Sequence, residues 1–217
     1  FERGYFNPKV PIAPDFIVTN SEVEQNLFKI YTDYKPKQLI LTGTPNLDLY
    51  VKNTEKQTDI TFMLTWRPWD LVGEISSNSY IDRYLQFIKL INELHFAENV
   101  NVILHPKARE ILTEQFPDVL KSIEEYLYEG DIKEALMKSK VLITDYSSIC
   151  FYAYAGGSKV IFFWGDKEES EKQYGAKNIL QEENAFGDII YDIDNKLLKT
   201  IKDNFYNNYE NKQYRKN

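Results

Sequence analysis

The sequence predicts an α/β domain, in which a parallel β-sheet is covered by helices on both faces. Short apolar segments of strand length alternate with longer amphipathic segments along most of the 217 residues. Hydrophobic residues make up 43% of the chain, which is enough to form a buried core. No internal repeat and no low-complexity segment interrupts the alternation. These features are typical of one Rossmann-like domain, here preceded by a shorter unit.

Residues 1–57 are expected to form the C-terminal remnant of a preceding domain, followed by a polar linker. The expected elements are a strand at 16–19, a helix that begins after Asn20 and Ser21, a strand at 38–41 and a short helix at 46–51. Ser21 is a favourable N-cap, and Glu22 and Glu24 place negative charge in the first turn, where the helix dipole favours it. The chain begins with Phe1 and not with Met, so we expect it to be a piece of a longer protein.

Residues 58–206 contain the main alternation of strands and helices. Strands are expected at 60–64, 100–104, 140–143, 160–163 and 188–191, and helices at 79–95, 108–115, 131–139, 147–155 and 193–209. In the first of these helices, Tyr80, Tyr84 and Phe87 recur at helical spacing. We therefore predict one Rossmann-like domain over 58–206, followed by a polar tail at 207–217.

Composition and charge exclude several classes of protein. The formal net charge is −7, which disfavours a protein that coats nucleic acid. No apolar run approaches the roughly 18 residues that span a bilayer, and no signal-peptide pattern opens the chain. The single cysteine, Cys150, argues against a disulfide scaffold and fits a reducing compartment, so we expect a cytoplasmic protein.

The chain also lacks common cofactor and metal motifs. Neither the Gly-x-Gly-x-x-Gly dinucleotide fingerprint nor the Gly-x-x-x-x-Gly-Lys-Ser/Thr phosphate loop is present. Two histidines and one cysteine are too few for a typical zinc site. We therefore expect no cofactor and no bound metal, and a carboxylate-bound Mg²⁺ is the alternative that the residues leave open.

Polar residues follow three of the expected strands. These strand ends are Thr65-Trp66-Arg67, His105-Pro106-Lys107 and Thr144-Asp145-Tyr146-Ser147-Ser148. In an open parallel sheet, ligands bind beyond the carboxyl ends of the strands. The three segments are far apart in the sequence but are expected at the same edge of the sheet, so together they predict one binding site.

The segment from Thr144 to Ser148 is a candidate anion site. It joins a strand to a helix, where free backbone N–H groups and serine hydroxyls favour a phosphate. A diphosphate fits this arrangement. The alternative is that Asp145 or Ser147 only caps the helix.

His105 and Arg67 are two further candidates. The imidazole of His105 can donate to a phosphate oxygen or transfer a proton, or it can be a structural residue. The guanidinium of Arg67 can bind a phosphate in a bidentate manner, or it can stack on Trp66 or Trp69. The residues alone leave both alternatives open.

Several motifs together resemble the CDP-glycerol glycerophosphotransferase family, the teichoic-acid and capsule polyol-phosphate transferases. The motifs that carry the resemblance are Leu142-Ile143-Thr144-Asp145-Tyr146-Ser147-Ser148-Ile149-Cys150-Phe151, Lys159-Val160-Ile161-Phe162-Phe163, Thr65-Trp66-Arg67, His105-Pro106, Gly43-Thr44-Pro45-Asn46-Leu47-Asp48 and Ser21-Glu22. The resemblance covers about residues 15–192. Its Thr-Asp-Tyr-Ser-Ser motif is fairly specific, whereas the other motifs are short.

The resemblance implies a GT-B type enzyme with two Rossmann-like domains, of which the C-terminal one holds the donor. Residues 1–57 would then end the acceptor domain, and 58–206 would bind the nucleotide donor. The implied reaction moves glycerol phosphate, or a related polyol phosphate, from a CDP-activated donor to a growing cell-wall or capsule polymer. The implied site consists of His105 as catalytic residue and of the donor-binding residues Arg67, Thr144, Asp145, Ser147 and Ser148.

The resemblance also implies partners and a location. The partners are CDP-glycerol or a similar nucleotide donor and a lipid-linked polymer acceptor, and no nucleic acid is expected. Because the acceptors of the family are lipid-linked, we expect peripheral contact with the inner face of the cell membrane, made by parts outside this segment. The helix expected at 193–209 is interpreted as a solvated face, because it carries three lysines (Lys196, Lys199 and Lys202) together with nearby aspartates (Asp192, Asp194 and Asp203).

The chain departs from the family pattern at several positions. The upstream Trp-His-Gly-Thr-Pro-like motif, whose histidine acts as the base in the family, is missing from this sequence. The family's Phe-Asp-Phe reads Phe151-Tyr152-Ala153, and Lys159 stands where proline is usual. Two alternatives therefore stay open: a GT-B glycosyltransferase that uses a nucleotide sugar, and a non-catalytic nucleotide-binding module.

Overall fold

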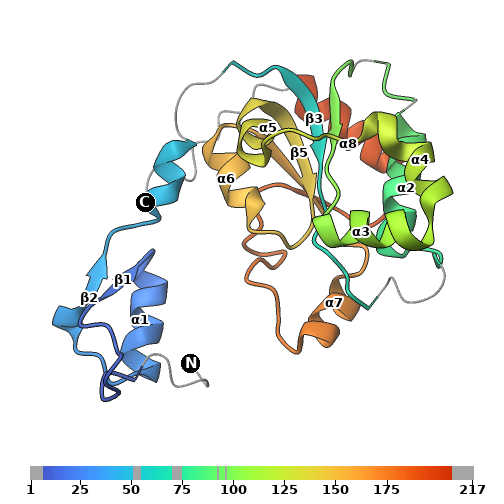
Figure 1. Cartoon of the computed structure of the whole chain (residues 1–217). Coiled ribbons are helices and arrows are strands. Elements are labelled where there is room, and N and C mark those ends of the chain that lie inside the picture. The colour runs from blue at the N-terminus through green and yellow to red at the C-terminus, as the bar shows by residue number, and fades with distance from the viewer. Residues whose placement is uncertain (1–6, 51–54, 70–74, 92, 96, 207–217) are drawn as a thin grey trace. The chain divides into compact units, whose positions relative to one another are not determined.

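The computed structural model describes residues 7–50, 55–69, 75–91, 93–95 and 97–206. The chain divides into two compact units, Phe1–Lys52 and Asn53–Asn217 (Figure 1). Each unit has a hydrophobic core of its own. The tail expected at 207–217 lies outside the described residues.

The first unit combines two short parallel strands with one α-helix. Its elements are β1 (Ile17–Thr19), α1 (Glu22–Tyr31), the 3₁₀ helix η1 (Pro36–Gln38), β2 (Leu39–Leu41) and the 3₁₀ helix η2 (Pro45–Leu49). Ser21 caps α1 as predicted, because its Oγ accepts a hydrogen bond of 3.1 Å from the backbone N–H of Glu24. The helix expected at 46–51 is the 3₁₀ helix η2, and residue 51 lies outside the described residues. The buried core consists of Ile17, Phe28, Tyr34 and Leu39.

The second unit is built on a parallel sheet, as predicted. Its strands are β3 (Thr58–Phe62), β4 (Val100–Val102), β5 (Ser139–Thr144), β6 (Lys159–Phe163) and β7 (Asp188–Ile190). They lie in the order β4-β3-β5-β6-β7, and every neighbouring pair is parallel. All the strands expected in this unit are present, with ends that differ by one or two residues.

The helices of the second unit follow the strands in alternation. They are α2 (Tyr80–Ile91), α3 (Pro106–Gln115), α4 (Pro117–Ile123), the 3₁₀ helix η3 (Glu124–Tyr126), α5 (Ile132–Lys138), α6 (Ile149–Ala155), α7 (Lys167–Tyr174) and α8 (Asn195–Tyr206). The helix expected at 147–155 begins later, at Ile149, because residues 145–148 form the connection from β5. The helix expected at 79–95 ends at Ile91.

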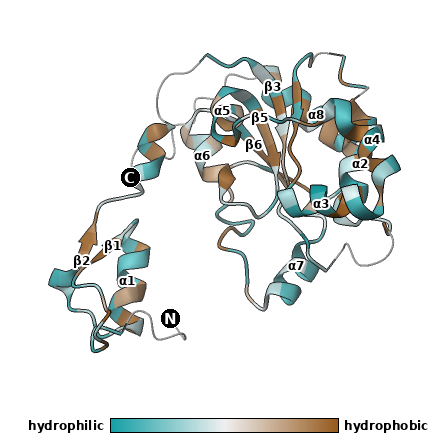
Figure 2. Ribbon diagram, viewed as in Figure 1, coloured by the Kyte–Doolittle hydropathy of each residue, from teal (hydrophilic) through white to brown (hydrophobic). Residues whose placement is uncertain are grey.

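Helices pack on both faces of the sheet, which confirms the predicted fold class. On one face, the β6 residues Val160 and Phe162 pack with Cys150 and Tyr154 of α6. On the other face, Ile161 of β6 belongs to the larger core that contains residues of α2 and α8. A strand that is buried on both faces reads as a continuous apolar run, and this is the pattern of β6. Figures 1 and 2 show the apolar sheet between the two sets of helices.

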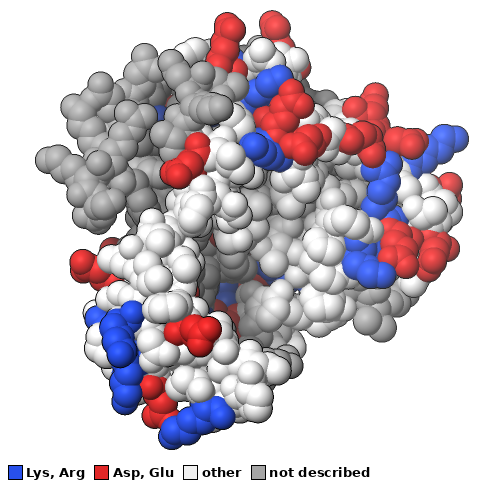
Figure 3. Space-filling model, turned by 60° about the vertical axis from the view of Figure 1, so that its left-hand side comes forward, with Lys and Arg blue, Asp and Glu red and all other residues white. Residues whose placement is uncertain are grey.

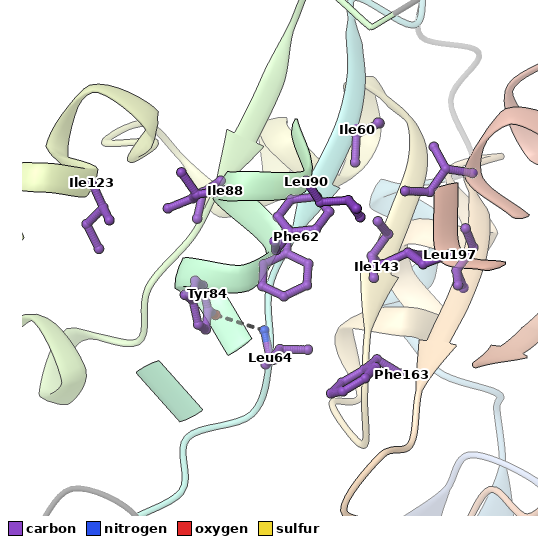
Figure 4. Packing of buried hydrophobic residues seen from close by; sticks show 14 of the residues in the cluster. Ile60, Phe62, Leu64, Tyr84, Ile88, Leu90, Ile123, Ile143, Phe163 and Leu197 are labelled. Atoms are coloured by element: carbon purple, nitrogen blue, oxygen red, sulfur yellow. Dashed lines mark hydrogen bonds between the residues drawn. The ribbon is translucent and has the colours of Figure 1, made fainter. Parts of the chain in front are cut away.

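The larger core lies between the sheet and α2. The rings of Phe62 and Phe87 stack with centroids 4.0 Å apart. Tyr84 meets Phe62 edge-on at 4.9 Å, and Figure 4 shows these two residues among the packed side chains. These contacts confirm the helical spacing of the aromatic residues in α2. They also fix α2 against β3, so that the residues after β3 leave the core at a defined position.

The strand order defines where a ligand is expected to bind. From β3 the chain first passes to β4 on one side, and β5 then returns to the other side of β3. The connections therefore diverge between β3 and β5. In doubly wound sheets, the crevice beyond the carboxyl ends of such a pair of strands is the usual ligand site.

Candidate functional site

The residues that follow β3 and β5 meet at this switch point. The backbone N–H of Thr65 donates to the Asp145 carboxylate, at 2.9 Å to Oδ1 and 3.0 Å to Oδ2. The Thr65 hydroxyl donates to Oδ1 of the same group at 2.7 Å. The expectation that the first and third polar segments lie together is therefore correct. Asp145 is fully buried and connects the two segments.

Arg67 lies beneath this edge and is paired with two carboxylates. Its Nη2 donates to Oδ2 of Asp145 at 2.7 Å, and its Nε donates to Oδ2 of Asp166 at 2.8 Å. Its Nη1 donates to the backbone oxygen of Thr65 at 2.6 Å. Burial disfavours the charged form, but the two carboxylates more than compensate and raise the pKa of Arg67. The side chain is 1% exposed, so its guanidinium acts within the protein, and direct contact with a donor stays a prediction.

Two charged residues that sequence reasoning missed complete this group. Asp166 follows β6 and accepts hydrogen bonds from Arg67, from Nη1 of Arg83 at 2.9 Å and from the Tyr146 hydroxyl at 3.2 Å. Burial opposes its ionisation, but the hydrogen bond and charge of Arg67 and the charge of Arg83 hold the pKa of Asp166 below its ordinary value. The strand-end rule that selected the other segments could have selected Asp166 as well. Nothing in the sequence marks Arg83, which lies within α2.

His105 is placed as the N-cap of α3, beyond the end of β4. Its Nδ1 accepts a hydrogen bond of 3.2 Å from the backbone N–H of Lys107. Its ring stacks on Trp66, with centroids 5.6 Å apart and an interplanar angle of 20°. Burial and the charge of Lys107 lower the pKa of His105. The imidazole is therefore neutral at neutral pH and carries its proton on Nε2, because Nδ1 is the acceptor.

A pair of tyrosines from α2 holds the ends of β3 and β4 together. The Tyr84 hydroxyl accepts from the Leu64 N–H at 2.9 Å (Figure 4). It donates to the Ile103 carbonyl at 2.8 Å. The Tyr80 hydroxyl donates to that of Tyr84 at 3.1 Å and accepts from the His105 N–H at 3.2 Å. These hydroxyls satisfy backbone groups that the strands leave unpaired, and they fix the backbone of His105.

Three hydroxyl groups lie near the end of β5. The Thr144 side chain is fully buried, and its Oγ1 has no hydrogen-bond partner among the described residues. Ser147 is half-buried, and among the described residues its Oγ accepts only a long contact of 3.5 Å from the Ile149 N–H. Ser148 is exposed and makes no capping hydrogen bond with its side chain. The structure does not favour the alternative in which Asp145 or Ser147 only caps the helix, because Asp145 accepts from Thr65 and Arg67 and the contact of Ser147 with α6 is long.

A cavity of about 630 Å³ lies beyond the ends of β6 and β7. Its lining residues are Trp164, Gly165, Asp166, Lys167, Glu168, Glu169, Lys172, Glu182 and Tyr191. Through Asp166 it adjoins the group around Arg67. The sequence did not indicate this cavity, because α7, which supplies much of its lining, was not predicted.

The remaining candidates carry no separate site. Cys150 is buried, and burial raises the pKa of its thiol to about 12, so it is a core residue and not a nucleophile. Within the described part of the chain, no group of three or more His, Cys, Asp or Glu residues is arranged to hold a metal ion. No helix among the same residues is long and apolar enough to cross a membrane. Figure 3 shows basic and acidic side chains interspersed over the described surface of one face.

The fold and the strand-end residues define a Rossmann-like domain with a polar site at its switch point. A family comparison then identifies the chain more closely. Residues 9–217 match the model of the CDP-glycerol:poly(glycerophosphate) glycerophosphotransferase family, and the chain belongs to this family. The resemblance inferred from the motifs is therefore confirmed.

Individual proteins are similar to this chain in sequence or in fold. The teichoic acid glycerol-phosphate primase of Bacillus subtilis (strain 168) is 25% identical over 175 residues, which are 77% of this chain and 44% of the relative. A variant of the wall teichoic acid polymerase TagF, soaked with CDPG, has a similar fold, with a TM-score of 0.62 and 20% identity over 88% of this chain and 50% of the polymerase. The UDP-GlcNAc 2-epimerase of Methanocaldococcus jannaschii shares the fold at a TM-score of 0.52 and 13% identity, over 90% of this chain and 56% of the epimerase.

These comparisons confirm the α/β, GT-B type fold class. They also show that the chain spans about half the length of the relatives that it matches.

Proposed function

We propose that this chain is the donor-binding part of a transferase that moves glycerol phosphate, or a related polyol phosphate, from a CDP-activated donor to a growing cell-wall or capsule polymer. The observation that carries the proposal is the meeting of the polar segments after β3 and β5 at the switch point of the sheet, in a chain that belongs to the glycerophosphotransferase family. In this proposal residues 58–206 bind the donor, and residues 1–57 belong to the end of the acceptor domain.

The proposed site binds the donor diphosphate mainly through hydrogen-bond donors. The hydroxyls of Ser147 and Ser148 contact phosphate oxygens, the fully buried Thr144 lies directly before their segment, and Nε2–H of His105 donates to the phosphate that is transferred. Asp145 and Arg67 act from below by holding the segments that carry these donors. His105 thus has an electrostatic role in the reaction, which its neutral tautomer with a proton on Nε2 supports.

The chemical step is an attack of an acceptor hydroxyl on the β-phosphorus of the donor. A new phosphorus–oxygen bond forms to the acceptor, the bond to the bridging oxygen breaks, and CMP leaves with the electron pair of that bond. The proton of the acceptor hydroxyl passes to a base outside the residues named above. Positioning and charge stabilisation are the contributions that the protein makes to such a step.

The charges around the site suggest that this chain supplies only part of the binding energy. Arg67 is neutralised by Asp145 and Asp166, while Lys107 is paired with Glu110 at 2.6 Å. Arg109 is paired with Glu129. A diphosphate carries negative charge that usually calls for cations or oriented amides. We therefore propose that parts of a longer protein complete the donor site. The same parts would bind the lipid-linked acceptor, and the reaction would take place at the cytoplasmic face of the membrane.

Calorimetric titration of the chain with CDP-glycerol, CDP, CMP, UDP and GDP tests the proposal. We expect the cytidine nucleotides to bind selectively, and we expect the double variant Ser147→Ala, Ser148→Ala and the variant His105→Ala to weaken binding by about tenfold or more. His95→Ala is the matched control, because His95 lies on an exposed turn after α2. A preference for UDP or GDP would instead support a nucleotide-sugar transferase, and unchanged affinity in the serine and His105 variants would refute the proposed site.

A further inference from the structure

Four charged side chains form a closed, neutral group under the candidate site. They are Arg67, Arg83, Asp145 and Asp166, and they are 1%, 7%, 0% and 11% exposed. Two positive and two negative charges balance, so the group offers no net charge to an anionic ligand. Its contribution to the site must therefore come from geometry.

The group connects the carboxyl ends of three adjacent strands. Arg67 follows β3, Asp145 follows β5 and Asp166 follows β6. The Arg67 guanidinium joins the two carboxylates at 2.7 and 2.8 Å. Hydrogen bonds to charged groups are stronger than those between neutral groups, and burial shields them from solvent. The three strand ends are thus fixed relative to one another.

Asp145 transmits this restraint to the proposed donor-binding segment. Besides the contacts from Thr65, its Oδ1 accepts a hydrogen bond of 2.6 Å from the Tyr146 N–H. Its backbone oxygen accepts from Nε1 of Trp164 at 3.3 Å. Ser147 and Ser148 follow directly, so a shift of the Asp145 carboxylate would displace their hydroxyls.

Tyr146 forms the second connection between Asp166 and this segment. Its hydroxyl donates to Oδ1 of Asp166 at 3.2 Å, and its ring lies 5.0 Å from the Arg67 guanidinium carbon. The ring also stacks on that of Trp164, with centroids 6.4 Å apart. The segment is therefore restrained on both sides of Asp145.

We propose that Asp166, acting through Arg67 and Tyr146, is a positioning residue that holds the segments 65–67 and 144–148 in the geometry that binds the donor. The role of these segments in donor binding rests on the proposed function. Arg83 is a positioning residue as well, because it extends from α2 and forms an ion pair with Asp166. The group acts on placement and not on charge, so its loss affects the mobility of both segments before any ligand is added.

Amide hydrogen exchange of the unliganded chain tests this inference directly. In Asp166→Asn, we expect the N–H groups of Thr65 and Tyr146 to exchange about tenfold faster, because both donate to Asp145 and the Arg67 guanidinium that pairs with Asp145 loses its second carboxylate partner. Tyr146→Phe removes only one hydroxyl and keeps the ion pairs, so it gives a smaller change in the same direction and remains measurable if Asp166→Asn does not fold.

Asp59→Asn is the matched control. Asp59 is also a buried carboxylate, and it is paired with Lys140 at 2.7 Å and accepts from the N–H groups of Glu98 and Asn99. It lies near the amino end of β3, at the opposite edge of the sheet. We expect this variant to lose stability without faster exchange at Thr65 or Tyr146.

Titration of the same variants with CDP-glycerol separates the two proposals. Faster exchange together with about tenfold weaker binding in Asp166→Asn supports both. If Asp166→Asn exchanges faster but the wild-type chain binds no nucleotide, Asp166 restrains the two segments and the proposed function is overturned. Unchanged exchange in both Asp166→Asn and Tyr146→Phe, or faster exchange with unchanged CDP-glycerol affinity, overturns the positioning role.

Discussion

At the scale of single residues, the contacts of His105 after β4 fix the tautomer and the orientation of its imidazole. Nδ1 accepts a hydrogen bond from the Lys107 N–H, and the Trp66 ring stacks on the imidazole. The proton is therefore left on Nε2, which faces away from the helix backbone. A side chain that is held in one tautomer by its neighbours is suited to donate a hydrogen bond to a phosphate.

The lowered pKa of His105 has a consequence for stability. Because the unfolded chain binds a proton at the ordinary value of about 6.5 and the folded chain only at a lower pH, acidification favours unfolding. We expect the free energy of unfolding to fall as the pH drops below about 6.5. His105→Asn keeps an oxygen that can accept from the Lys107 N–H, and should remove this part of the pH dependence. Urea unfolding of both proteins as a function of pH measures the difference, and identical profiles would contradict the account.

At the scale of elements, Lys56 joins the ends of two helices. Its ammonium donates to the carbonyl of Met137 near the end of α5 and to that of Gly156 after α6, both at 2.7 Å. A third hydrogen bond of 3.2 Å reaches the Ser158 hydroxyl. Burial lowers the pKa of Lys56 to about 8, so the group stays protonated at neutral pH. A cation at helix C-termini satisfies carbonyls that the helices leave unpaired.

We expect Lys56→Met to destabilise the second unit by about 1–3 kcal/mol, because the partly buried carbonyls lose their donor while the apolar stem is kept. Lys121→Met, at an exposed position of α4, is the control and should change stability little. The midpoint of urea unfolding at unchanged slope measures both effects. Equal midpoints for the two variants would show that Lys56 does not stabilise the helix ends.

Sequence patterns predicted the strands and the long amphipathic helices, and missed one polar helix and several short elements. The strands and α2 were predicted because their apolar residues repeat at strand or helix spacing. In α7 only Ser170 is buried, so no apolar stripe marks the helix, and Figure 2 shows it as largely hydrophilic. The short α4 and η3 were missed as well, because they follow α3 with no intervening strand.

The candidate site shows the same limit. The strand-end rule selected Thr65, Arg67 and Asp145, and the structure brings these residues together. It could not show that Arg67 points inward, because a sequence gives no direction for a long side chain. Arg83 is placed by the packing of α2 on the sheet, which depends on the tertiary fold.

At the scale of the whole molecule, the chain belongs to the glycerophosphotransferase family but spans about half the length of the relatives that it matches. The second unit contains the switch point, the hydroxyls after β5 and the neutral group beneath them. This content of the second unit is the reason to propose donor binding by this chain. The central claim is therefore about where the nucleotide binds.

Backbone chemical shifts of the isotope-labelled chain during titration with CDP-glycerol test this claim most directly. The account predicts changes that saturate and that centre on His105 and on the segment Thr144–Ser148, with weaker changes on addition of UDP or GDP. The amides near Asp59, at the opposite edge of the sheet, should stay unchanged. No change at the predicted residues, or changes centred near Asp59, would contradict the proposed donor site.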